Sequence, residues 1–156
     1  MTDHRWVTVK VQLVSGPTDL DHPPGRILLV GPTHTFADLA DAIDTAFARW
    51  DLAHSHEFQL PDGRLVGTPD DDLEDFGLDP VLDDTAMAVT DHLHAGDTFS
   101  YTFDRGDDWV HQCSVDNPDA DPSDAHGPLP TRPVPIWGWG NIPDQYGRLT
   151  YDHLSR

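Results

Sequence analysis

The sequence predicts an α+β fold, a mixed β-sheet with one main amphipathic helix packed on a face. Three observations predict it. Val7, Val9, Val11 and Leu13 alternate with polar residues, which is the pattern of a half-buried strand. Apolar residues at helical spacing occupy the range 36–50. Two further alternating runs, rich in aromatic residues, lie between Thr98 and Val115 around a short acidic turn.

The first strand is followed by a loop rich in turn-forming residues, which runs from Gly16 to Gly25. Arg26 to Val30 is then a short β-prone run, and Gly31-Pro32 ends it. With the helix that follows, this beginning of the chain resembles a β-grasp arrangement.

The helix is predicted over Phe36–Trp50. Thr35 is a suitable N-cap residue, and Asp38 three positions later completes the pattern of a capping box. One face carries Phe36, Leu39, Ala40, Ile43, Phe47 and Trp50. Arg49 lies at the end of the helix, where the macrodipole favours a cation.

Shorter elements follow the helix. His56 to Leu60 is predicted to be a strand, and the turn Pro61-Asp62-Gly63-Arg64 leads into Leu65-Val66. Asp70 to Gly77 is predicted to be an acidic loop. The apolar run Ala86 to Leu93 is compatible with either a strand or a short helix. The predicted hairpin Thr98–Val115 completes a core domain over residues 1–115.

The character of the chain changes after this domain. Half of the 14 prolines lie between Pro118 and Pro143. Residues 116–127 are predicted to form a flexible acidic linker, and residues 128–156 an extended Pro/Trp-rich segment docked on the core. Docking is expected because Ile136, Trp137, Trp139 and Tyr146 supply apolar area that a disordered tail rarely carries.

Charge is the strongest signal in the composition. The chain of 156 residues has 9 Lys and Arg against 28 Asp and Glu, a formal net charge of −19, and Lys10 is its single lysine. Such a surface repels phosphate backbones and anionic lipids, so direct nucleic-acid and membrane binding are not expected. We expect a protein partner or a small ligand. The single cysteine, Cys113, and the absence of an apolar leader or spanning segment favour a cytoplasmic protein.

The hairpin supplies the candidate ligand-binding residues. Phe99, Tyr101 and Phe103 point one way along its first strand, and Trp109, His111, Cys113 and Val115 along its second. The turn between them is acidic. The candidates are Tyr101, Asp104, Asp107, Trp109 and His111. The alternative is structural, with Trp109 as a core residue whose indole N–H needs one acceptor, and the Asp side chains as turn formers.

A divalent metal is considered because imidazole and carboxylate ligands suit Zn²⁺ or Ni²⁺. The candidate ligands are His54, His56, His111 and Asp107. The pattern is not specific, since ten histidines in an acidic chain produce His-x-His pairs by chance and no HExxH motif is present. No cofactor is expected. No nucleophile elbow, phosphate loop or dinucleotide fingerprint occurs, which favours a role other than catalysis.

At the hairpin the chain resembles a known family, the Ri-plasmid open-reading-frame-three-like proteins, also labelled insertion-element passenger TnpR-like proteins. The family hallmark, Asp-Phe-Gly-Asp-x-Trp-x-His, stands here as residues 104–111, with Arg105 in place of Phe. A second matching piece is the amphipathic helix followed by His54-Ser55-His56-Glu57-Phe58. The resemblance covers about residues 5 to 115. It implies an α+β fold near β-grasp and no established activity.

Three hypotheses follow. The first is a non-enzymatic binding or interaction domain that uses the sheet face near Trp109 and His111. The second is a metal-dependent enzyme that uses the His/Asp cluster. The third is an acidic decoy or inhibitor of a basic or DNA-binding protein, encoded on a mobile element; its basis is the charge and the association of the resembled family with plasmids and transposons.

Overall fold

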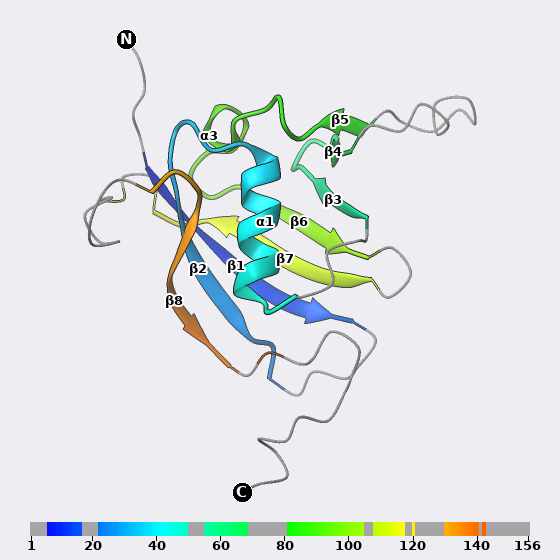
Figure 1. Cartoon of the computed structure of the whole chain (residues 1–156), viewed down its shortest axis with the longest axis vertical. Helices are drawn as coiled ribbons and strands as arrows, with labels where there is room; N and C mark the ends of the chain where they lie inside the picture. Colours follow the sequence, from blue (N-terminus) through cyan, green and yellow to red (C-terminus); the bar gives the residue numbers. More distant parts are fainter. Residues whose placement is uncertain are drawn as a thin grey trace, which may run out of the picture.

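A computed structural model describes residues 6–16, 22–49, 55–68, 81–104, 108–117, 120, 130–140 and 142. Within these ranges eight strands form one sheet, and the helix α1 (Phe36–Ala46) lies across one face of it (Figure 1). The predicted α+β class, with a mixed sheet and few helices, is confirmed. The likeness of its start to a β-grasp fold stays a prediction.

The strand order is β5-β4-β3-β6-β7-β1-β2-β8. The strands are β1 (Val7–Ser15), β2 (Gly25–Val30), β3 (His56–Gln59), β4 (Leu65–Gly67), β5 (Val81–Asp83), β6 (Thr98–Phe103), β7 (Trp109–Val115) and β8 (Val134–Trp139). Neighbouring strands are antiparallel except β4 and β5, which are parallel. The ambiguous run between residues 86 and 93 contains a short helix, α3 (Val89–His92). The predicted acidic loop 70–77 lies outside the described residues.

The start of α1 agrees with the sequence prediction, but its end does not. Thr35 and Asp38 form the expected capping box. The helix ends at Ala46, before the predicted Trp50, because Ala48 adopts a left-handed conformation with φ of 57°. The backbone N–H of Arg49 then donates to the carbonyl of Asp44 at 2.8 Å, in the pattern that closes many helices. This turn directs Arg49 into the core, where it is 7% exposed, and not out to solvent at the helix terminus.

The core lies between α1 and the sheet. Side chains alternate along each central strand, so the predicted inward sets of β1, β6 and β7 all face α1 and are buried. Tyr101 and His111 are directly opposite one another on β6 and β7, and Leu13 is opposite His111 on β1. The aromatic hairpin therefore supplies the floor of the core beneath the C-terminal half of α1.

The C-terminal segment adds the strand β8 to the edge of the sheet beside β2. The indole of Trp139 covers Gly25, where any side chain would collide with its ring, and its Nε1–H donates to the carbonyl of Pro23 at 3.2 Å. Further upstream, the buried His34 contacts the carbonyl of Pro130 through Nε2 at 3.1 Å. Docking of the complete segment 128–156 stays a prediction, since only 130–140 and 142 are described.

Residues from the predicted linker also contact the sheet. The backbone N–H of Asp116 donates to the carbonyl of Thr8 at 2.9 Å, and that of Ala120 donates to the carbonyl of Trp6 at 2.8 Å. Residues 118, 119 and 121–127 of the linker lie outside the described residues.

Candidate functional site

A hydrogen bond joins α1 to the sheet inside the core. The hydroxyl of Tyr101 lies 3.0 Å from both carboxylate oxygens of Asp44, and both residues are buried. Burial raises the pKa of Asp44 to about 7, although the bond from Tyr101 and the charge of Arg49 act in the opposite direction. Burial also raises the pKa of Tyr101, and the neighbouring Asp44 adds to this effect. Tyr101 therefore remains a neutral donor.

His111 lies beside Tyr101 and is completely buried. Its Nδ1 is 2.9 Å from the backbone carbonyl of Tyr101, and a carbonyl can only accept, so Nδ1 carries the proton. Nε2 is then an unprotonated acceptor, and it is buried with no hydrogen-bond partner among the described residues. Burial, helped by the charge of Arg49, lowers the pKa of His111 to about 3. The imidazole is therefore neutral at physiological pH.

Arg49 carries the positive charge of this cluster. Its guanidinium carbon lies 5.5, 5.5 and 5.3 Å from the ring centres of Phe47, Phe103 and Trp109. These distances are typical of cation–π contacts, which stabilise a cation where water is excluded. Burial lowers the pKa of Arg49 to about 10, which still leaves it charged at neutral pH. Its Nη1 is buried without a hydrogen-bond partner in the described part of the chain.

Trp109 closes the cluster at the start of β7. The residue is 1% exposed, and its ring packs against the backbone of Gly16, where a Cβ atom would collide with it. The expected acceptor for the indole N–H is not found: Nε1 is buried with no partner within the described ranges. We call Asp44, Arg49, Tyr101, Trp109 and His111 the core polar cluster.

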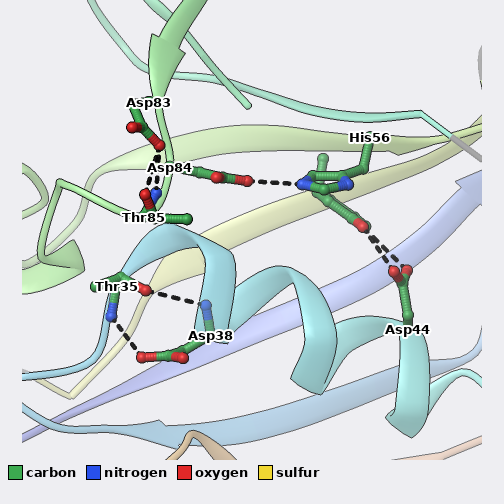
Figure 2. Close-up of polar contacts among 8 residues, drawn as sticks. Thr35, Asp38, Asp44, His56, Asp83, Asp84 and Thr85 are labelled. Atoms are coloured by element: carbon green, nitrogen blue, oxygen red, sulfur yellow. Dashed lines mark hydrogen bonds and ion pairs between the residues drawn. The ribbon is translucent and has the colours of Figure 1, made fainter. Parts of the chain in front are cut away.

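His56 lies at the margin of this cluster. Its Nε2 is 2.7 Å from the carboxylate of Asp84, which is nearly buried between β5 and α1 (Figure 2). The rings of His56 and His111 flank that of Tyr101, at centroid distances of 6.2 and 5.4 Å. The metal candidates His54 and Asp107 lie outside the described residues. Among those that are described, no group of three or more potential ligands could hold a metal ion.

Three of the five ligand-binding candidates from the sequence, Tyr101, Trp109 and His111, thus meet in the core and not at the surface. Asp104 lies at the hairpin turn with φ of 62°, where its backbone N–H donates to the carbonyl of Ser55 at 2.7 Å. Asp107 is outside the described residues. Asp44 is not among the site residues predicted from the sequence, although an acid directly after Ile43, on the apolar side of the helix, is a usable signal.

The opposite face of the sheet differs in composition. The adjacent strands β6, β7, β1, β2 and β8 contain no Asp or Glu. Pairing places Lys10, Gln12, Gln112, Ile27 and Trp137 on the face away from α1, because each alternates with residues that face the helix. We call these five residues the open face. Trp137 is 66% exposed and lines a shallow hollow of about 420 Å³ with Arg26, Pro135, Gly138, Trp139 and Gly140.

The comparison with family models gives a match over residues 6–143, to the plasmid pRiA4b ORF-3-like proteins. The chain belongs to this family. The match includes the resembled hairpin as well as β8, and it agrees with the family suggested by the sequence. In this member of the family, the hallmark residues Trp109 and His111 are core residues.

A solved structure supports the fold of this ORF-3-like chain. A protein of unknown function from Methanosarcina mazei Go1, MM3350, is similar with a TM-score of 0.64 and 21% sequence identity, over 88% of this chain and 71% of that one. At this identity the likeness concerns the fold alone. No curated protein matches the chain. No helix in the described ranges is long and apolar enough to cross a membrane.

Proposed function

We propose that the chain is a non-catalytic binding domain that recognises a protein partner through the open face. The observation that carries this proposal is Trp137, which is 66% exposed on a face whose five strands hold no acidic residue. The proposal moves the contact surface away from the expected face near Trp109 and His111, because these two side chains are 1% and 0% exposed.

An exposed tryptophan is typical of the energetic centre of an interface, because its large ring buries much apolar area at a low cost in conformational entropy. Around it, Gln12 and Gln112 provide amide groups that both donate and accept hydrogen bonds. Lys10 provides the only ammonium side chain of the protein. This combination of an aromatic centre and a polar rim is that of protein interfaces.

The low strand propensity of Asp explains part of this composition, since the acids of the chain are almost all Asp. The low strand propensity of Asp does not explain why Trp137 remains exposed on these strands. In a chain with a net charge of −19, a face without acids is also a place that a partner can approach with little like-charge repulsion.

The expected partner presents an apolar side chain to Trp137 and hydrogen-bond acceptors to Lys10. Contact through the face is favoured over pairing with the edge of β8, because this edge strand contains Pro135 and proline in an edge strand opposes the addition of another strand. A cytosolic location and an association with mobile elements remain part of this proposal.

The experiment places a photo-activatable cross-linking residue at Gln112 on the open face, or at Asp41 on the exposed side of α1, in the cell that produces the protein. We expect one defined protein to be cross-linked from position 112 and not from position 41. Trp137→Ala should abolish this product while leaving the melting temperature unchanged, because the side chain is mostly exposed.

The other outcomes identify the rivals. Salt-sensitive capture of a basic protein from position 41 alone would support the acidic decoy. Stoichiometric metal in protein purified without a His-tag, together with turnover, would support the metal-dependent enzyme. A cross-linked homodimer from position 112 would replace the foreign partner by a second copy of the chain.

A further inference from the structure

The core polar cluster contains three buried polar atoms that lack partners in the described part of the chain. They are Nη1 of Arg49, Nε1 of Trp109 and Nε2 of His111. Their residues are 7%, 1% and 0% exposed. A buried polar group without a partner lowers stability, and native cores contain few of them. Two of the three, Arg49 Nη1 and Trp109 Nε1, are donors and indicate that an acceptor is bound there. His111 Nε2 is itself an acceptor, so the same ligand leaves it without a partner.

Arg49 and Phe47 connect the three side chains through ring contacts. The guanidinium carbon of Arg49 is 5.3 Å from the Trp109 ring centre and 5.5 Å from that of Phe47. The ring of His111 lies 5.0 Å from that of Phe47, and the charge of Arg49 affects its pKa. Trp109 and His111 are two positions apart on β7, so they share a face of that strand.

The chemistry of the two unpartnered donors indicates the kind of acceptor that binds them. Arg49 Nη1 and Trp109 Nε1 are donors only. The buried guanidinium forms no ion pair within the described ranges, and rings compensate only part of the cost of burying a charge. A water molecule would satisfy the donors but would not balance the charge. An anion does both.

We infer that Arg49 and Trp109 form an internal site for a small monovalent anion beneath the end of α1, with His111 as its neighbour. The site is independent of the proposed partner surface, which lies on the other side of the sheet. Nitrate, bromide and formate belong to this chemical class.

The ionisation of Asp44 provides a test that distinguishes anion binding from a purely structural role of the cluster. Its pKa is raised to about 7, so its carboxyl group is mainly neutral below that pH and negative above it. The charged or titratable groups around it are Asp41, Arg49, His56, Tyr101 and His111. An ionised Asp44 competes with the anion for the positive potential of Arg49. Binding should therefore weaken as the pH rises from 5.5 to 8.5, and Asp44→Asn should remove most of this dependence.

The experiment measures the binding of nitrate to the full chain by calorimetry at pH 5.5, with ionic strength held constant by sodium fluoride. Arg49→Met should raise the dissociation constant by at least about tenfold, which corresponds to 1.4 kcal/mol. Trp109→Phe should also weaken binding, because it removes the indole N–H and keeps an aromatic ring. Arg64→Met is the matched control, since this arginine is exposed and already paired with Asp62.

A crystal soaked in bromide locates the site. An anomalous peak beside Arg49 and Trp109 supports the inference. If water fills the site and no anomalous peak is present, the inference is overturned. Equal loss of nitrate binding in Arg64→Met would also overturn it, because the binding would then be a general surface effect. If Arg49→Met fails to fold, the Trp109→Phe titration and the bromide map still decide the question.

Discussion

The Tyr101 hydroxyl lies 3.0 Å from each carboxylate oxygen of Asp44, and this contact joins β6 to α1 across 57 positions of the chain. Tyr101→Phe removes the hydroxyl and leaves a buried carboxyl group without its donor. We expect a loss of about 1–3 kcal/mol in the free energy of unfolding, measured with urea. Ser114→Ala is the control, because its hydroxyl donates to the exposed Asp116, and it should change the value by less than about 0.5 kcal/mol. Equal urea midpoints for the two variants would contradict the hydrogen bond between Tyr101 and Asp44.

Asp44 makes stability depend on pH. Its pKa is about 7 in the folded protein against 3.8 ordinarily, so the folded state holds the proton more tightly. The resulting stabilisation is complete below pH 3.8 and is lost as the pH rises through 7. The amide side chain of the Asp44→Asn variant cannot ionise. The free energy of unfolding of this variant should therefore rise relative to that of the wild type as the pH increases between these limits, by at most about 1.4 kcal/mol per pH unit. A difference that is constant between pH 4 and 8 would show that Asp44 ionises normally.

His111 affects the pH dependence of stability in the opposite direction to Asp44. Its pKa is about 3 when folded against 6.5 ordinarily, so the unfolded chain binds the proton first as the pH falls. Its contribution to stability is complete above pH 6.5 and is lost as the pH falls toward 3. His111→Gln should therefore become more stable relative to the wild type on acidification, in contrast to Asp44→Asn. Urea unfolding at several pH values separates the two, and parallel profiles of both variants would refute this account.

Phe47 is the aromatic side chain that links the helix end to the cluster. It is 1% exposed and contacts Arg49 and His111. Phe47→Ala should cost about 3–5 kcal/mol through the lost burial and the cavity that remains. Phe47→Leu, which refills part of the space, should cost less. Thermal unfolding tests both variants, and a melting temperature within a few degrees of the wild type for Phe47→Ala would be inconsistent with this packing.

Gly25 and Trp139 form a steric pair at the edge of the sheet. Because a Cβ atom on Gly25 would collide with the indole, Gly25→Ala should displace Trp139 and weaken the pairing of β8 with β2. The same substitution should be nearly neutral in a Trp139→Ala background, where the obstacle is gone. The four proteins form a double-mutant cycle, read by chemical denaturation. Additive effects would mean that the ring does not lie on Gly25.

Local patterns in the sequence predicted most of the sheet and the start of the helix. Alternation along Val7–Leu13 and through the hairpin is enough, because each strand buries one face. Thr35 and Asp38 mark the helix start through contacts within four residues. The end of the helix escaped prediction because the left-handed Ala48 is favoured by the packing of Arg49 under distant rings. Pairing of β8 with β2 depends on contacts more than a hundred positions apart, which no local pattern reports.

The candidate site was predicted in the same uneven way. Tyr101, Trp109 and His111 were found because one hairpin carries all three and alternation places them on one face. The burial of Trp109 agrees with the alternative interpretation of this residue as a core residue. The burial of Tyr101 and His111 with Asp44 and Arg49 was not predicted, since the sequence does not show what covers that face. Asp44 is one of many acids in the chain, and its position on the apolar side of the helix is the one sequence signal for its burial. Its partner Tyr101 is visible in the structure alone.

The acid-free strands have a consequence for handling the protein. The exposed Asp41 lies on α1, on one side of the sheet, whereas Lys10 lies on the other. Among the described residues, α1 therefore attracts a positively charged resin or electrode, and the strands of the open face do not. A molecule held through α1 points Trp137 to the liquid phase. An array of such molecules presents the same surface to every analyte, without a tag or a chemical linker.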